Sequence, residues 1–168
     1  MKTTNFNWGD TTIDSRDIIT RHEELQEEYD ALVENLEEAA SEFRFLSNSD
    51  ESSLAEYQDA ENTFALAQNA FDEFNEYDNK EELDLLNEVI AQGEDSPDWS
   101  YGEVLINESY FTEYTKDLID DCYDFPSEFT DGKWPWNHMN MDWEAAAEEA
   151  KADYTTIEVG GETYYIRA

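Results

Sequence analysis

The stretch that decides the fold is residues 17–46, which read DIITRHEELQEEYDALVENLEEAASEFRFL. A seam of residues spaced four and three apart runs through it without a break, and its members are Ile18, His22, Leu25, Tyr29, Leu32, Leu36, Ala39, Phe43 and Leu46. This a/d pattern over about four heptads is typical of a long helix packed as a coiled coil. At about 1.5 Å per residue, such a helix spans about 45 Å.

The chain then turns back. Residues 47–50, which read SNSD, favour a turn. A second seam with the same spacing follows at Ser53, Tyr57, Ala60, Phe64, Ala67, Phe71 and Phe74. Because a short connection makes consecutive helices antiparallel neighbours, the two seams predict an antiparallel helical hairpin. Its small and large seam residues alternate, so they can interdigitate.

The rest of the chain changes character. Residues 81–92 predict a short amphipathic helix that ends at Gly93 as a cap, and residues 93–97 resemble a linker. Residues 102–106 favour a strand and residues 108–123 a helix, and Asp142 is expected to cap another helix. Residues 155–159 and 162–167 alternate around Gly160-Gly161, which predicts a β-hairpin.

The expected fold class is therefore mostly α with a small α+β part. A long antiparallel coiled-coil hairpin is followed by a compact C-terminal module that ends in a β-hairpin. We expect a flexible N-terminal arm over residues 1–16, an acidic helical hairpin plus a third helix over residues 17–93, and an α+β module over residues 98–168.

The charge of the chain is extreme. It holds 44 Asp and Glu against 9 Lys and Arg, a net charge of −35 on 168 residues. Because 14% of its residues are aromatic, a folded domain is expected and not a disordered acidic tail. Ordinary solubility needs a net charge of only about 2–8. B-DNA carries about one charge per 1.7 Å, so 35 charges match about 60 Å of duplex.

The seams also predict where the carboxylates point, because residues off the seam lie on the outer faces of the helices. A single Glu there is usually only a solvated residue, so a binding role would belong to the whole set. The acids that we expect to contact a partner are Glu23, Glu24, Glu27, Glu28, Glu34, Glu37, Glu38, Glu56, Asp59, Glu61, Asp72, Glu73 and Glu76.

Motifs for catalysis or cofactor binding are missing from the sequence. His22 lies on the helical seam, His138 follows an aromatic loop, and Cys122 is the only cysteine. There is no glycine-rich phosphate loop, no two-histidine metal motif and no EF-hand loop. We therefore expect no enzyme, no cofactor and no discrete metal site. The first residues, MKTTNFNWGD, do not resemble a signal peptide, and no apolar run is long enough for a membrane span. A cytoplasmic protein is expected.

The C-terminal part carries a more specific pattern, in the segments 102–111, 134–138, 141–147 and 161–167 together with Tyr114, Asp153 and Tyr154. Over residues 98–168 the chain resembles acidic antirestriction proteins of phages and mobile elements, of which the ArdA-type DNA mimics are a kind. The resemblance implies an elongated, dimeric inhibitor of a defence enzyme in the bacterial host cytoplasm. The long heptad hairpin departs from that family.

Two functions remain open from the sequence. The first is a DNA mimic whose carboxylates occupy the basic nucleic-acid-binding cleft of a host defence protein, such as a restriction-modification or CRISPR enzyme. The second is an acidic coiled-coil interaction or scaffold protein without mimicry. Direct binding to nucleic acid or to a membrane is not expected, because the charge has the wrong sign. The long hairpin has two sides to cover, and the short third helix is not expected to cover both. Ile19, Val33 and Phe45 also widen the apolar face of the first helix, so a homodimer is compatible with either function.

Overall fold

The computed structural model of the protein describes residues 7–49, 53–76, 78–124, 127 and 131–168. Within them the chain divides into two units, residues 19–88 and residues 7–18 with 89–168. The first unit is helical, and the second contains a four-stranded antiparallel sheet with short helices. The predicted fold class, mostly α with a small α+β part, is confirmed.

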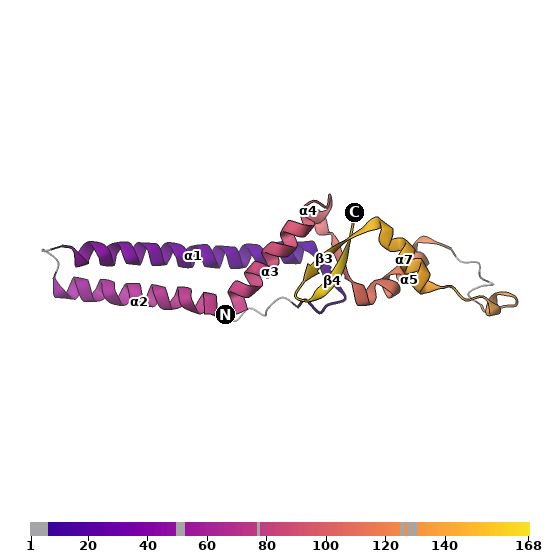
Figure 1. The fold of residues 1–168 in the computed structure, drawn as a ribbon, viewed down its shortest axis with the longest axis horizontal. Helices are drawn as coiled ribbons and strands as arrows, with labels where there is room; N and C mark the ends of the chain where they lie inside the picture. Colours follow the sequence, from indigo (N-terminus) through magenta and orange to yellow (C-terminus); the bar gives the residue numbers. More distant parts are fainter. Residues whose placement is uncertain (1–6, 50–52, 77, 125–126, 128–130) are drawn as a thin grey trace. The chain divides into compact units, whose positions relative to one another are not determined.

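Three helices build the first unit, and the longest two run side by side in opposite directions (Figure 1). They are α1 (Ser15–Ser47) and α2 (Leu54–Glu76), followed by α3 (Asp78–Gly93). Aromatic seam residues join α1 to α2. The ring of Phe43 stacks on Phe64 with centroids 5.6 Å apart, and Tyr29 contacts Phe71 at 5.8 Å. The two predicted seams therefore do face each other.

The core of the first unit is concentrated at one end of the hairpin. Leu25, Phe74, Leu83 and Leu86 are buried there, where α3 joins the other two helices. Along the rest of the hairpin, only Ala39 and Ala60 are buried among the described residues 31–49 and 53–73. Two helices without a third neighbour leave most of their side chains in contact with solvent.

A buried ion pair joins α1 to α3, and no sequence motif predicted it. Arg21 is 8% exposed and Glu82 is 4% exposed. The guanidinium binds the carboxylate through two hydrogen bonds, Nε to Oε1 at 3.0 Å and Nη2 to Oε2 at 2.8 Å. This bidentate geometry satisfies two charged groups that would be costly to bury singly.

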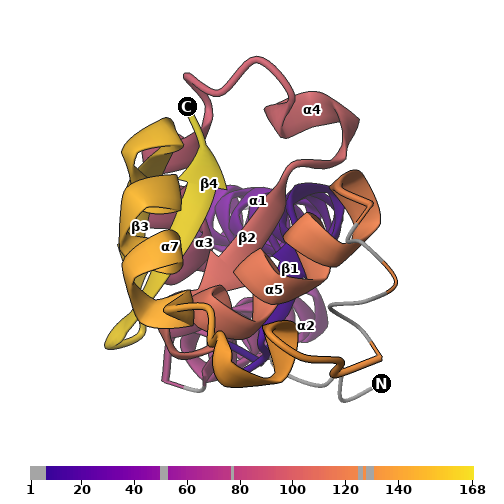
Figure 2. The ribbon, with the colours of Figure 1, turned by 90° about the vertical axis from the view of Figure 1, so that its right-hand side faces the viewer.

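The second unit is organised around strands in the order β1-β2-β4-β3. The strands are β1 (Thr12–Asp14), β2 (Val104–Asn107), β3 (Tyr154–Val159) and β4 (Glu162–Arg167). The predicted hairpin joins β3 to β4, and Gly160 and Gly161 have positive φ angles of 58° and 83° that suit the tight turn. Helices α5 (Phe111–Cys122) and α7 (Trp143–Ala150) lie across one face of the sheet (Figure 2). The predicted cap at Asp142 accepts a hydrogen bond from the Ala145 N–H at 3.1 Å.

The expectation of a flexible arm over residues 1–16 is wrong for residues 15 and 16, which begin α1, and for residues 12–14. Residues 12–14 form β1, which pairs with β2 so that Ile13 lies opposite Leu105, and Ile13 is buried. The sheet recruits this short segment because the exposed edge of β2 supplies backbone partners for it. Residues 1–6 of the expected arm lie outside the described residues.

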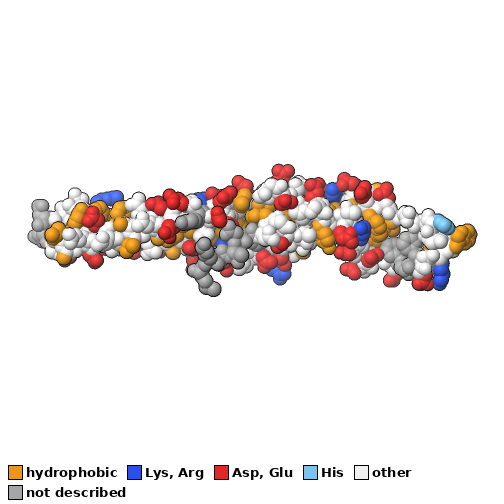
Figure 3. All heavy atoms as spheres, turned by 90° about the horizontal axis from the view of Figure 1, so that it is seen from below, with side chains coloured by type: hydrophobic (Ala, Val, Ile, Leu, Met, Phe, Trp, Pro, Cys, Tyr) orange, Lys and Arg blue, Asp and Glu red, His pale blue; other side chains and the backbone are white. Residues whose placement is uncertain are grey.

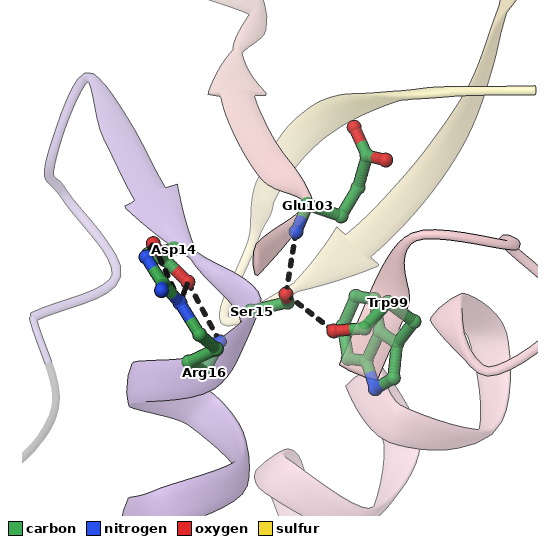
Figure 4. Close-up of polar contacts among 5 residues, drawn as sticks. All are labelled: Asp14, Ser15, Arg16, Trp99 and Glu103. Carbon is green, nitrogen blue, oxygen red and sulfur yellow. Dashed lines mark hydrogen bonds and ion pairs between the residues drawn. The ribbon is translucent and has the colours of Figure 1, made fainter. Parts of the chain in front are cut away.

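The predicted linker over residues 93–97 and the predicted domain limits also need correction. The units divide after residues 18 and 88, so Gly93 and the segment after it belong to the sheet unit. Trp99, in the one-turn helix α4 (Trp99–Gly102), is buried against Gly93. The Ser15 hydroxyl donates to the Trp99 carbonyl at 2.6 Å and accepts from the Glu103 N–H at 2.8 Å (Figure 4). These contacts hold the segment in place.

Candidate functional site

The candidate site is the set of outward-facing carboxylates on α1 and α2. All thirteen acids expected to contact a partner are exposed, namely Glu23, Glu24, Glu27, Glu28, Glu34, Glu37, Glu38, Glu56, Asp59, Glu61, Asp72, Glu73 and Glu76. Seven of them lie on α1 and six on α2, and the helical period places them away from the aromatic contacts.

One row of acids is continuous along α1. Glu23, Glu27, Asp30 and Glu34 line a shallow groove of about 520 Å³ together with His22 and other side chains of the same helix. Neighbours in this row are three or four residues apart, which places them about 5–6 Å from one another. Asp30 was not in the predicted set and completes the row.

Basic residues do not neutralise this surface. Residues 19–88 hold 22 Asp and Glu against 3 Lys and Arg, a net charge of −19. Arg21 is bound to Glu82 and also contacts Glu24 at 3.3 Å, and Lys80 is paired with Asp84. Among the described residues, Glu24 is the one member of the predicted set that makes an ion pair. The other twelve carboxylates are open to a cationic partner.

The charge along the hairpin has a definite density. The part of α1 that belongs to the first unit is residues 19–47, and its length is about 43 Å. The 15 acids and 2 bases on this part of α1 and on α2 leave a net charge of −13. That is about one charge per 3.3 Å, close to the 3.4 Å of one DNA strand and half the density of the duplex. Figure 3 shows Asp and Glu side chains spread over the face in view, with few Lys and Arg side chains between them.

Local contacts fix some of these charged groups. The Ser53 backbone N–H and the Ser53 hydroxyl both donate to Oε2 of Glu56 at 2.8 Å. These hydrogen bonds lower the pKa of the Glu56 carboxyl below its ordinary value. The hydrogen bond to Glu82 raises the pKa of Arg21, so this guanidinium stays charged. Glu56 lies in the first turn of α2, and Arg21 lies at the end of the hairpin where α3 joins the other two helices.

The acidic surface has a gap that sequence reasoning missed. Residues 62–71, NTFALAQNAF, carry no charge. On one flank of the hairpin they face α1 across a groove of about 410 Å³. We call it the alanine groove, and its small lining residues are Ala39, Thr63, Ala67 and Ala70.

Larger side chains also line the alanine groove. Leu32 and Leu66 add apolar surface, and Leu66 is 70% exposed. Glu38 and Glu42 of α1 contribute two exposed carboxylates. The uncharged run 62–71 was the signal in the sequence that could have located this groove.

The histidines and the other acids do not assemble a site for chemistry in the described part of the chain. Nε2 of His22 lies 2.9 Å from Oδ1 of Asn87, a contact between α1 and α3, and His138 is exposed in a short 3-10 helix. Among the residues that the structure describes, no group of three or more His, Cys, Asp or Glu side chains is placed to hold a metal ion. None of the described helices is long and apolar enough to cross a bilayer.

Comparison with protein-family models, with curated proteins and with solved structures finds no match for this chain. The resemblance to antirestriction proteins therefore stays a prediction. The functional argument has to come from the carboxylates of the hairpin and from the alanine groove.

Proposed function

We propose that the protein is a DNA mimic. Its hairpin carboxylates occupy the basic, nucleic-acid-binding cleft of a host defence protein, for example a restriction-modification or CRISPR enzyme, and exclude DNA from it. The single observation that carries this proposal is a set of twelve exposed carboxylates that make no ion pair with the residues described, on two helices whose net charge per length is close to that of one DNA strand.

The cost of this arrangement supports a use for it. Like charges three or four residues apart destabilise a helix by about 0.2–0.5 kcal/mol per pair. Lys and Arg side chains could relieve that repulsion, but the hairpin carries only two of them, Arg21 and Arg44. A basic cleft would provide the missing positive charge, and complementary potentials would also speed association.

The experiment starts with capture of binding proteins from a bacterial lysate on the tagged, full-length chain at low salt. Bound proteins are then eluted either with rising salt or with competitor duplex DNA. The proposal expects a DNA-binding protein that leaves the column under both treatments, because charge pairs are screened by salt and the duplex takes the same cleft.

A row variant tests whether position matters beyond total charge. It combines Glu23→Gln, Glu27→Gln, Asp30→Asn and Glu34→Gln. Four exposed ion pairs at about 0.2–1 kcal/mol each correspond to a loss of about fourfold to several hundredfold in affinity for the captured protein.

A matched control removes the same charge from exposed positions in the sheet unit, with Glu94→Gln, Asp120→Asn, Glu144→Gln and Glu149→Gln. The proposal expects this variant to bind more tightly than the row variant. Equal losses in both variants, or partners that resist salt and ignore DNA, would contradict mimicry. The second result would favour an acidic coiled-coil scaffold.

A further inference from the structure

We infer that the alanine groove binds a cationic amphipathic helix of the target protein. The inference rests on the proposed function and names a second element of the partner, because a basic cleft alone would not need an uncharged groove. The basic cleft of the target would contact the exposed carboxylates of α1 and α2. One helix of the target would lie along the alanine groove.

The groove is long enough for a short helix. It runs between two antiparallel helices, and its lining on α1 extends from Leu32 to Glu42, about 15 Å or three helical turns. Small side chains at Ala39, Ala67 and Ala70 let another backbone approach closely. Docking of an amphipathic helix into an apolar groove is a recurring mode of recognition.

The exposed apolar surface in the groove specifies the face of the occupant. Leu66 lines the alanine groove, and 70% of its surface is still exposed to solvent. Burial of apolar surface is favourable, so a leucine or isoleucine on the incoming helix would be stabilised here. An entirely polar segment would leave this surface uncovered.

The charge around the groove specifies the edge of the occupant. Glu38 and Glu42 lie on one side, and no Lys or Arg lines the groove among the residues described. Lysines or arginines along the edge of a partner helix would pair with these two carboxylates. A second copy of the hairpin would instead bring its own net charge of −13, so the groove is better suited to a basic helix than to self-association.

The probe is a fluorescent synthetic peptide of about fourteen residues with leucines on one helical face and lysines along its edges. A second peptide has the same composition in an order that destroys the amphipathic face. Fluorescence anisotropy with the full-length protein is expected to show at least tenfold weaker binding of the reordered peptide. Equal binding of both would mean attraction by charge alone and would overturn the inference.

Two matched variants locate the peptide on the protein. Ala70→Trp places a large side chain in the groove, whereas Ala65→Trp adds the same side chain at an exposed position of α2 that does not line it. The inference expects Ala70→Trp to weaken peptide binding at least tenfold and Ala65→Trp to change it less than twofold. Equal effects of the two variants would overturn it.

Self-association is measured on the same proteins by sedimentation. A dimer that Ala70→Trp dissociates, and that the peptide does not disrupt, would assign the groove to a second copy and overturn the inference. The result also separates the two proposals. If the row variant loses its DNA-competable partner while the peptide ignores the groove, the proposed function stands and this inference fails.

Discussion

Replacement of Arg21 by methionine is expected to cost about 3–5 kcal/mol of the free energy of unfolding. The side chain is 8% exposed and binds Glu82, itself 4% exposed, through two hydrogen bonds of 2.8 and 3.0 Å. Methionine has similar bulk but no charge, so the variant leaves a buried carboxylate without its guanidinium. Domains are stable by about 5–15 kcal/mol in total, so about a fifth or more of that margin would be lost.

The chain provides a control for this measurement on the same helix. Arg44 is exposed, and Arg44→Met changes the net charge by the same amount. A surface substitution of this kind is expected to stay within about 0.5 kcal/mol. Urea denaturation followed by far-UV circular dichroism gives both values.

A double variant separates the ion pair from simple loss of packing. Arg21→Met with Glu82→Met removes both buried charges, and such replacements are often neutral or stabilising. The double variant is therefore expected to be more stable than Arg21→Met alone. If Arg21→Met costs no more than Arg44→Met, or if the double variant is the least stable of the three, the reasoning about the buried pair is refuted.

Three further predictions concern the packing and the cap described above. Ser15→Ala is expected to lower the free energy of unfolding by about 1–3 kcal/mol in urea, because the lost hydroxyl bridges the Trp99 carbonyl of α4 and the Glu103 N–H just before β2, whereas Ser100→Ala at an exposed site should change little. Gly93→Ala would place a methyl group 2.3 Å from the Trp99 ring and is expected to cost about 1–3 kcal/mol; an unchanged denaturation midpoint would speak against this contact. Because hydrogen bonds lower the pKa of Glu56, its stabilising contribution is complete above the unfolded value of about 4.3 and is lost as the pH falls through the lower folded value, so NMR titration should give a midpoint below that of free Glu.

Elements with local signals could be predicted from the sequence. The seams of α1 and α2, the cap at Asp142 and the turn at Gly160-Gly161 each depend on residues that are close together in the chain. The outward positions of the predicted acids followed from the same helical period. The helical period did not predict the alanine groove, because the groove forms where side chains of two different helices meet.

Features that depend on distant partners could not be predicted. The segment β1 has three residues and pairs with β2, so its own pattern was too short to indicate a strand. The predicted helix does end at Gly93, but Gly93 lacks the positive φ common in a glycine cap, and the Trp99 ring occupies the space that a side chain at this position would need. The pairing of Arg21 with Glu82 joins residues on different helices without a sequence signal.

The strand order β1-β2-β4-β3 has a consequence for the order of folding. Ile13 meets Leu105 across a loop of about 90 residues, and β4 must come between β2 and β3 before the sheet is complete. Closing a loop of that length costs about 4 kcal/mol in its length-dependent part, whereas α1 and α2 meet across a short turn. The hairpin is therefore expected to gain its structure first, and pulse-labelled hydrogen exchange should protect amides of α1 and α2 before those of β1. During synthesis, the acidic helices would be exposed to the cell before the sheet unit exists.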